Sequence, residues 1–337
     1  MEISVAYVKM GMDPIITRFF WGCCVKRGWL VRGSVGVLLA VGCALAAEPV
    51  PTTVMSFNIR YGTADDGPDS WEHRRYLVRL AIREHDPFIF GVQECLWDQG
   101  VELDRAFGGY RITGVGRDDG VRRGEMCLIF TRRDRYRVLD QGYFWLGETP
   151  EVPGSKGWDV ACPRIVTWVK LRDRWCDPDT FYCFNTHLDH AGAEARRLGA
   201  ELLQRRMAEI AGGLPIILLG DFNAPAAADS PPYRLLAEEG WRADVPLHDT
   251  WHAAASEQRR RGGGTFHGFT GEATRGRIDW ILASREFAVI DAGLSRFQKD
   301  GRYPSDHFPV WATFHQERHP PLPGDEVDVT TGATPHY

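Results

Sequence analysis

The sequence predicts an α/β (α+β) fold in which two packed β-sheets carry helices on their outer faces. Two observations support this prediction. From residue 52, apolar segments of strand length alternate with amphipathic segments of helix length, and the strands outnumber the helices. At 337 residues, with 44% hydrophobic and 25% charged residues, the chain is long enough to bury the core that such a fold requires.

The N-terminal segment has the pattern of a targeting sequence. Three basic residues precede the apolar run 34–47, which ends in small residues. A charged start, a short apolar core and an Ala-x-Ala-like exit are typical of a secretory signal peptide, and the run is short for a membrane span. We therefore expect residues 1–47 to form an N-terminal extension with a cleaved signal peptide, and the protein to be exported. An uncleaved anchor helix is the alternative, and Cys43 is a weak match to a lipoprotein acylation site.

Charge and cysteine content limit the class of protein. Residues 1–47 hold five of the 40 Lys and Arg and two of the 45 Asp and Glu, so the remainder carries 35 basic and 43 acidic residues, net −8. A broad nucleic-acid-binding surface usually shows a basic excess. Five cysteines follow residue 47, an odd number without the spacing of a zinc site. Of these, Cys176 and Cys183 flank a turn and could bridge a hairpin.

Strands and helices are expected to alternate in the first part of the chain. Asp69 and Ser70 offer a helix N-cap, followed by the acidic Glu72. The stretch 192–211 is the clearest helix, because its large apolar residues fall on one stripe and its charges on the other. The expected strands are 52–59, 87–94, 110–115, 125–131, 136–145, 165–171 and 181–186, and the expected helices are 71–85, a segment ending near 107, and 192–211.

Strands dominate the second part of the chain. We expect a buried strand at 216–219, a short helix near 233–239, and strands at 277–282, 287–292 and 310–314. The Arg- and Gly-rich run 259–264 is expected to be a surface loop. Residues 317–337 are Pro-rich and are expected to form a flexible tail, so the folded domain should span residues 48–316.

Asp221 and Asn223 stand at the exit of the buried strand 216–219. Residues two apart in an extended backbone point to the same side, so this carboxylate and this amide would share one pocket at the edge of a sheet. The alternative is an Asx turn, in which Asp221 only bonds its own backbone. The recurrence of the same arrangement at other strands favours the pocket.

Polar residues stand at the ends of several predicted strands. They supply hard oxygen ligands, two imidazoles and two amides, without the Cys/His spacing of a zinc site. A hard cation held by one or two carboxylates keeps its waters and binds phosphate oxygens, while imidazole and carboxylate groups move protons. The set therefore suits magnesium-assisted attack of water on a phosphorus centre. Its members are Asn58, Glu94, His187, Asp221, Asn223, Asp279, Asp306 and His307.

These residues lie in six short motifs: Asn58-Ile59-Arg60, Gln93-Glu94, Thr186-His187-Leu188, Gly220-Asp221-Phe222-Asn223, Arg277-Ile278-Asp279 and Ser305-Asp306-His307. In this order the motifs resemble the endonuclease/exonuclease/phosphatase superfamily over about residues 52–315, and its exported bacterial members in particular. The resemblance implies a DNase I-like four-layer sandwich, two mixed β-sheets flanked by helices, with residues 48–316 as the catalytic domain. It also implies a hydrolase of phosphoesters that uses Mg²⁺, or Mn²⁺, and in-line attack of an activated water.

The resemblance further implies a role for each motif residue. Glu94 is the implied main metal ligand, with Asn58 beside it and Asp306 near the metal. Asp221 is implied to orient or deprotonate the attacking water, and Asn223 to hold water or phosphate.

Two histidines complete the implied catalytic set. His307, partnered by Asp279, is implied to lie at the scissile phosphate, and His187 to stabilise or protonate the leaving side. Which histidine is the acid and which the base stays open. Four residues near the motifs or strands are candidate phosphate or substrate contacts, with structural roles as an equal alternative: Arg60, Arg164, His190 and His267.

The fold does not select the substrate, because the superfamily acts on nucleic acids, phospholipid headgroups and sugar or inositol phosphates. The net charge of −8 favours a small phosphoester, so we expect a monomer that binds a phosphorylated small molecule or lipid headgroup. A secreted nuclease is the first alternative and would show a basic strip beside the site, with Arg122, Arg123, Arg132, Arg133 and Arg259–Arg261 as candidates. A non-catalytic binding module is the second, and it is disfavoured because every polar position is filled.

Overall fold

The computed structural model describes residues 50–175, 180–238, 247–254, 263–273 and 275–316. Several predictions fall outside these ranges and stay predictions: the signal peptide at 1–47 with Cys43, the thiol of Cys176, the loop at 259–262 and the tail at 317–337. Within the described ranges, no helix is both long and apolar enough to cross a membrane. Cys183, the other half of the proposed disulfide, is a buried free thiol.

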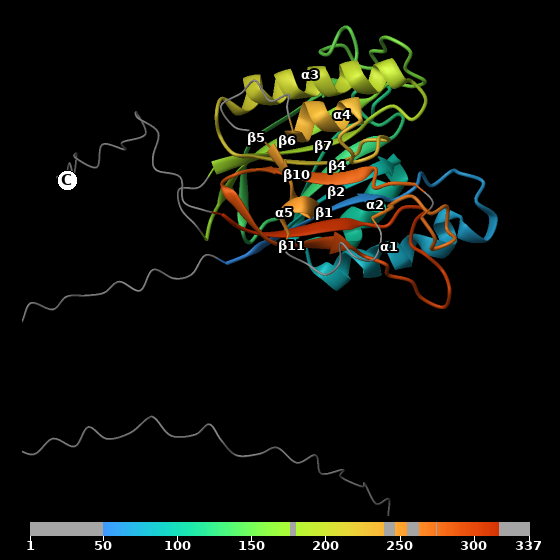
Figure 1. The fold of residues 1–337 in the computed structure, drawn as a ribbon. Coiled ribbons are helices and arrows are strands. Elements are labelled where there is room, and N and C mark those ends of the chain that lie inside the picture. Colours follow the sequence, from blue (N-terminus) through green and yellow to red (C-terminus); the bar gives the residue numbers. More distant parts are fainter. Residues whose placement is uncertain (1–49, 176–179, 239–246, 255–262, 274, 317–337) are drawn as a thin grey trace, which may run out of the picture. The chain divides into compact units, whose positions relative to one another are not determined.

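Two six-stranded sheets form the centre of the folded part of the chain (Figure 1). Sheet A has the strand order β11-β12-β1-β2-β4-β3, and sheet B has the order β5-β6-β7-β8-β10-β9. Both sheets are mixed, because β1 runs parallel to β2 and β7 runs parallel to β8 while the other neighbours are antiparallel. The predicted fold class, two mixed sheets in a DNase I-like sandwich, is thus confirmed.

The elements have the following bounds. The strands are β1 Thr52–Asn58, β2 Ile89–Cys95, β3 Tyr110–Thr113, β4 Met126–Arg132, β5 Tyr136–Trp145, β6 Ile165–Asp173, β7 Thr180–His187, β8 Ile216–Asp221, β9 Leu247–Asp249, β10 Asp279–Ser284, β11 Phe287–Leu294 and β12 Val310–Gln316. The helices are α1 Trp71–His85, α2 Trp97–Ala106, α3 Ala193–Ala211, α4 Pro231–Tyr233 and α5 Thr250–Ala253, with short turns η1 at Gly67–Asp69 and η2 at Arg234–Glu238.

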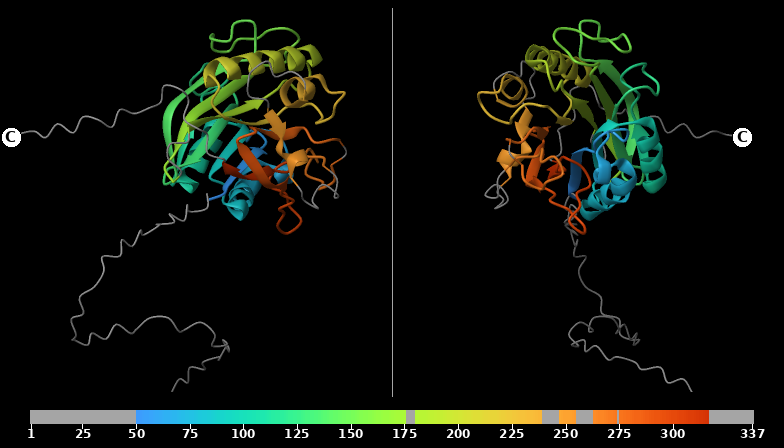
Figure 2. Two further views of the ribbon diagram at one scale, coloured as in Figure 1. Left: turned by 60° about the vertical axis from the view of Figure 1, so that its left-hand side comes forward. Right: turned by 90° about the vertical axis from the view of Figure 1, so that its right-hand side faces the viewer.

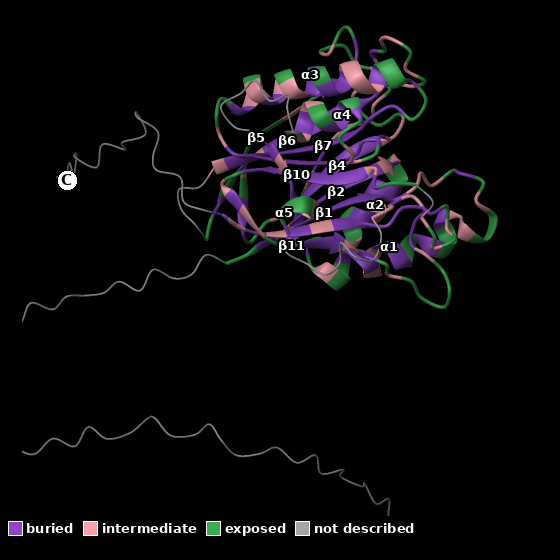
Figure 3. Ribbon diagram, in the orientation of Figure 1, coloured by how far each residue is buried: buried purple, intermediate pink, exposed green. Residues whose placement is uncertain are grey.

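Helices cover the outer face of each sheet. The apolar residues of α1 and α2 pack with those of β1, β2 and β4 in one core cluster, and those of α3 and α4 pack with β7, β8 and β10 in another. A third cluster lies between the sheets and joins residues such as Val54 of β1 to Leu219 of β8. Figure 2 shows the resulting layers of helix, sheet, sheet and helix, and Figure 3 shows that the strands are buried while the outer faces of the helices are exposed.

Most predicted elements are present, with a few differences. Ser70 is the N-cap of α1, but no side chain makes a capping hydrogen bond there, so the predicted capping role of Asp69 and Ser70 is not seen. Strand β9 and helix α5 were not predicted. Each is only three or four residues long, and β9 forms by pairing with β10, a contact from outside its own sequence.

Strand direction determines where the polar residues lie. Because β1 and β2 are parallel, their carboxyl ends meet at one edge of sheet A, and those of β7 and β8 meet likewise at one edge of sheet B. Antiparallel β10 begins beside the end of β8, with Asp279 paired to Asp221, and β12 begins beside the end of β1. One end of the sandwich therefore collects polar residues from both sheets.

Candidate active site

The eight polar residues predicted at strand ends come from both sheets, and the structure links them through hydrogen bonds and short ion pairs at one end of the sandwich. His187 ends β7 and lies beside Asp221 at the end of β8. From sheet A come the last residue of β1, a residue of β2 and the segment that leads into β12, carrying Asn58, Glu94, Asp306 and His307. The sandwich thus places acids, amides and imidazoles from distant parts of the chain within one largely buried cluster.

Asp221 is the centre of this cluster. Its Oδ2 atom accepts a hydrogen bond from the Asn58 amide at 2.9 Å and lies 3.4 Å from Nε2 of His187 and 3.8 Å from Nε2 of His307. Its Oδ1 atom accepts the backbone N–H of Asn223 at 2.9 Å, which is the Asx turn considered as the alternative. Both interpretations therefore hold at once, because each oxygen serves one of them. Burial and the negative charge of Asp279 raise the pKa of Asp221 to about 7.

His307 is paired with Asp279. The His307 Nδ1 atom lies 2.9 Å from Oδ2 of Asp279, and both side chains are buried. Burial lowers the pKa of His307, but the negative charges of Asp279 and Asp221 outweigh it and raise this pKa well above its usual value. With Nδ1 donating to a carboxylate, Nε2 faces Asp221, so the ring is held in one orientation.

His187 has the opposite electrostatic environment. Burial, together with the positive charges of Arg164 and Arg117, lowers the pKa of His187 well below its usual value, so the ring is neutral at pH 7. Its Nε2 atom lies 2.9 Å from Nδ2 of Asn223, which also donates to the Leu188 carbonyl. Because this amide nitrogen is a donor, Nε2 accepts and the ring proton resides on Nδ1.

Glu125 also lies at the candidate site, a position that the strand-end pattern did not predict. Its carboxylate accepts two hydrogen bonds of 2.7 Å from Arg117, and its Oε2 lies 4.0 Å from Nδ1 of His187, an atom with no hydrogen-bond partner among the described residues. Burial raises the pKa of Glu125, against the effect of Arg117. It directly precedes β4, and β4 begins beside the carboxyl end of β2. The sequence signal for Glu125 is the same as for the other site residues, a polar residue next to a strand end. Because β4 is antiparallel to β2, this polar residue stands at the start of the strand.

The residues suggested for metal binding lie together at the end of sheet A. Glu94 accepts the Asn58 amide at 2.9 Å and the Tyr61 backbone N–H at 3.1 Å. Burial, with the negative charge of Glu94 adding to it, raises the pKa of Asp306. A buried carboxylate whose pKa is raised in part by a neighbouring carboxylate fits a site for a divalent cation, which would neutralise both charges.

Asn58 contributes its nitrogen to this arrangement. Its Nδ2 atom donates to both Glu94 and Asp221, while its Oδ1 accepts the backbone N–H of Arg60 at 3.0 Å. Ligand atoms of Glu94, His187 and Asp221 lie within 4.8 Å of one another, which makes them a possible metal-binding group. In the structure Asn58 therefore orients the two carboxylates, and its oxygen is already used by the backbone.

Two of the predicted phosphate contacts form a pair. Nη2 of Arg164 lies 2.8 Å from Nδ1 of His190, and Nε lies 3.4 Å from Asp189. The remaining Arg164 nitrogen, Nη1, is buried and has no hydrogen-bond partner among the described residues. Arg164 also lines a cavity of about 10 Å³ beside Glu94 and His187. Arg164 therefore reaches the site. His190 is exposed and is connected to the site through Arg164.

The other two predicted contacts lie near Asp306. Arg60 makes two hydrogen bonds to Asp66, and its Nε lies 3.8 Å from Asp306. His267 stacks on Phe308 at 4.0 Å between ring centroids, and its backbone N–H bonds the Asp306 carbonyl. Burial lowers the pKa of His267 to about 4, and its buried Nε2 has no partner among the described residues. Both side chains are thus placed at the edge of the cluster.

Three site residues have strained backbones. Arg60, Glu94 and Asn223 adopt φ angles of 57°, 56° and 48°, in the left-handed region that non-glycine residues seldom occupy. Such conformations cost free energy and gather at functional sites, where the surrounding fold enforces them. Their occurrence at or just after the ends of β1, β2 and β8 agrees with a functional site at this end of the sandwich.

The comparisons with known proteins agree with this geometry. The Endonuclease/Exonuclease/phosphatase family matches residues 55–307, which is most of the chain. The protein belongs to this family, and the family's members hydrolyse phosphoester bonds, so the chain is a hydrolase of that class. The predicted superfamily and the predicted enzyme class, a phosphoester hydrolase, are both confirmed.

Two solved structures are similar to this chain over most of its length. An endonuclease/exonuclease/phosphatase family protein from Bacteroides thetaiotaomicron is 36% identical, with a TM-score of 0.71 over 79% of this chain and 98% of that one. A mannosyl-6-phosphatase from the same organism is also 36% identical, with a TM-score of 0.68 over 77% of this chain and 98% of that one.

The eukaryotic protein Nocturnin is a more distant relative. The Drosophila melanogaster protein is 27% identical over 172 residues, which is 46% of this chain, and the chain spans about a quarter (24%) of that protein. The human Nocturnin catalytic domain, with a bound sulfate anion, is 21% identical with a TM-score of 0.60, over 79% of this chain and 93% of that one, which shows the shared fold alone.

Proposed function

We propose that the protein is a metal-dependent phosphatase or phosphodiesterase of a small phosphorylated molecule, with a sugar phosphate as the leading substrate class. One observation carries the hydrolytic proposal. Asp221 Oδ2 lies within 3.8 Å of the Nε2 atoms of both His187 and His307. A carboxylate flanked by two imidazoles, beside acids that can hold a cation, suits attack of water on phosphorus.

The two histidines take different roles. His307, with its raised pKa, is cationic and is suited to bind a phosphate oxygen or protonate the leaving group. Asp221 is the group suited to orient the attacking water and accept its proton, with Asn223 beside it. Neutral His187 accepts a hydrogen bond from the Asn223 amide and forms part of the polar lining of the site. The sequence left open which group is the acid and which the base. From the charges we propose that His307 is the acid and Asp221 the base.

We propose Mg²⁺, with Mn²⁺ as a substitute, as the cofactor. Glu94 and Asp306 would hold it, with Asn58 orienting the Glu94 carboxylate. A bound divalent cation would supply charge that offsets the negative phosphate and lowers the pKa of a water. Arg164 and Arg60 are proposed to bind phosphate oxygens, because guanidinium groups match them in shape and charge.

The proposed substrate rests on two observations. A relative 36% identical over nearly its whole length is a mannosyl-6-phosphatase. The candidate basic strip is also incomplete: β4 runs antiparallel to β2, so Arg132 lies beside Phe88, about 20 Å from Glu94 at the other end of the strand. Arg132 is paired with Asp86 and Asp134 there.

Two arginines of the candidate strip lie in the loop before β4. Arg122 stacks over the Trp97 ring at 4.3 Å, and Arg123 pairs with Asp119. The part of the strip at 259–261 lies outside the described residues. Arg122, Arg123 and Arg132 are thus each engaged by a neighbouring side chain, which gives no support to the nuclease alternative. Export remains a proposal from the sequence alone.

A substrate panel tests the proposal. Hydrolysis would be measured with Mg²⁺ for mannose 6-phosphate, inositol phosphates, sphingomyelin, bis-p-nitrophenyl phosphate, plasmid DNA and single-stranded RNA, with Glu94→Ala and His307→Ala proteins as controls. We expect turnover of sugar phosphates that both substitutions abolish. Rapid plasmid nicking with no turnover of small phosphoesters would overturn the substrate class. Equal activity in the controls would overturn the site.

A further inference from the structure

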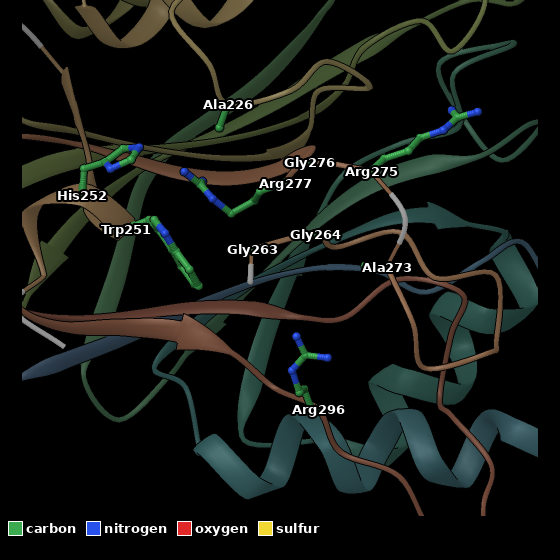
Figure 4. Close-up of a pocket in the computed structure, with 10 residues that line it drawn as sticks. All are labelled: Ala226, Trp251, His252, Gly263, Gly264, Ala273, Arg275, Gly276, Arg277 and Arg296. Atoms are coloured by element: carbon green, nitrogen blue, oxygen red, sulfur yellow. The ribbon is translucent and has the colours of Figure 1, made fainter. Parts of the chain in front are cut away.

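A pocket of about 400 Å³ is lined by Ala226 and Arg277, which are close in sequence to Asn223 and Asp279 of the candidate site (Figure 4). Arg277 and Arg296 extend toward it from opposite sides, the Trp251 ring forms another wall, and Arg275 points away from them. This volume is within the range of small-molecule sites. The other lining residues are His252, Gly263, Gly264, Ala273 and Gly276.

The pocket is built by the same segments that carry the catalytic residues. Arg277 is two residues before Asp279, and Ala226 is three residues after Asn223, so each Cα lies within about 11 Å of a catalytic one. The two segments are joined by a 2.8 Å hydrogen bond from the Ala226 N–H to the Arg277 carbonyl. A molecule that fills the pocket would therefore reach toward the reacting phosphate.

Neighbouring side chains hold the Arg277 guanidinium in place, and part of it remains available to donate hydrogen bonds. Arg277 is buried, its Nη2 bonds Asp249, and its guanidinium lies 5.3 Å from the Trp251 ring. Asp249 is itself fixed by the Tyr233 hydroxyl at 2.8 Å. Among the described residues, the hydrogen bond of the Arg277 side chain is made by Nη2. The other guanidinium nitrogens can therefore donate to a ligand or water in the pocket.

The described lining of the pocket includes three arginines and no carboxylate, although Arg275 points away from the other two and Asp249, which is not part of the lining, pairs with Arg277. Arg296 lies over the ring of Phe308 at 4.9 Å, and Phe308 follows His307. Guanidinium groups bind oxyanions through paired hydrogen bonds, and a ring such as Trp251 can pack against the carbon skeleton that carries them. An anionic group is therefore the occupant that fits.

We propose that this pocket binds a second anionic group of the substrate. The preferred substrate would then be a small molecule, such as a sugar, with one phosphate at the catalytic cluster and a second phosphate or similar oxyanion between Arg277 and Arg296. This inference rests on the proposed hydrolysis of small phosphoesters and narrows it from phosphomonoesters in general to doubly anionic ones.

The test compares two probes that differ in one phosphate. The kcat/KM values for glucose 1,6-bisphosphate and glucose 6-phosphate would be measured for the parent protein and for Arg296→Gln and Arg277→Gln. Arg137→Gln, an exposed arginine on β5, is the matched control. We expect the parent to favour the bisphosphate at least tenfold. Each pocket substitution should reduce that ratio by about ten- to a hundredfold, the equivalent of one charge-assisted hydrogen bond.

The outcomes separate this inference from the function on which it rests. An equal ratio in all four proteins would overturn the pocket's role while leaving phosphatase activity established. If neither probe is hydrolysed, calorimetry on the same proteins decides. Tighter binding of the bisphosphate that is lost in Arg296→Gln would support the pocket, and equal binding of both probes would overturn it. Arg296 is exposed, so its substitution should leave the fold intact.

Discussion

The Oδ2 atom of Asp279 lies 2.9 Å from Nδ1 of His307, while the other Asp279 oxygen is buried without a hydrogen-bond partner among the described residues. The pair joins the first residue of β10 in sheet B to the segment entering β12 in sheet A. The orientation and charge of this imidazole thus depend on one carboxylate from the opposite sheet.

Replacing Asp279 by Asn should remove that charge without changing the shape of the side chain. The amide cannot stabilise an imidazolium, so we expect kcat to fall by about 10²- to 10⁴-fold, with the melting temperature close to that of the parent. Steady-state kinetics and thermal unfolding would measure both. If the pair acts as a unit, the double variant with His307→Ala should be no slower than His307→Ala alone. Additive losses would contradict this.

Removing the metal should abolish turnover. EDTA is expected to stop hydrolysis and Mg²⁺ to restore it. A Glu94→Gln protein should need a Mg²⁺ concentration higher by at least about tenfold, because it lacks a charged ligand. Titration calorimetry with Mg²⁺ gives the affinity directly. Unchanged Mg²⁺ affinity in this variant would show that Glu94 is not a ligand.

Glu125→Gln tests the residue that the sequence analysis did not select. The carboxylate faces the Nδ1 atom of His187 and is held by Arg117. Loss of its charge should lower kcat by about ten- to a hundredfold while KM changes little, because it acts on the imidazole and not on the substrate. Exposed Glu148→Gln is the control. A KM effect alone would point to substrate binding instead.

Arg74 should be important for stability. This buried side chain of α1 donates hydrogen bonds to four backbone carbonyls, those of Ile59, Arg60, Asp69 and Pro304. Arg74→Met would leave several of these acceptors unpaired, so we expect the free energy of unfolding to fall by about 3 kcal/mol or more. Chemical denaturation would measure it.

The neighbouring Arg75 provides the control for this substitution. It is exposed and pairs only loosely with Glu102, at 3.4 Å. Arg75→Met should change the free energy of unfolding by no more than about 0.5 kcal/mol. Equal losses in the two variants would mean that the carbonyl contacts of Arg74 contribute little.

His85 should make the protein less stable in acid. Burial lowers the pKa of this residue, whose ring stacks on Trp311, below its usual value of 6.5. As the pH falls below 6.5, the unfolded chain binds a proton that the folded state resists, so stability decreases. His85→Gln lacks this effect. The stability difference between the parent and this variant should therefore shift in favour of the variant between pH 8 and pH 5, as measured by denaturation at each pH.

Most of the strand-end site could be predicted because it follows from local sequence. A strand that ends in a polar residue is visible in the sequence, and several such endings in one α/β chain must meet at the same sheet edges. Asp221, Glu94 and His307 were found in this way. The metal ligands and the catalytic roles assigned to these residues stay predictions until the experiments above are done.

The remaining features depend on contacts that the sequence does not reveal. The Asn58 amide donates hydrogen bonds through its nitrogen because two carboxylates lie next to it. The backbone of Asn223 is in the left-handed region because its N–H group donates to the Asp221 carboxylate. Strand β9 forms only against β10, and the pocket beside Arg277 needs loops that lie far apart in the chain. Such features arise from tertiary packing, which local patterns do not encode.

The pairing of β1 with β12 joins Thr52 to Phe314, two residues near opposite ends of the described chain. Because Asp306 and His307 lie on the segment that enters β12, the ribosome must release almost the entire domain before these side chains can meet Asp221 and Asp279. A growing chain therefore carries no assembled phosphoesterase site until the last strand has docked.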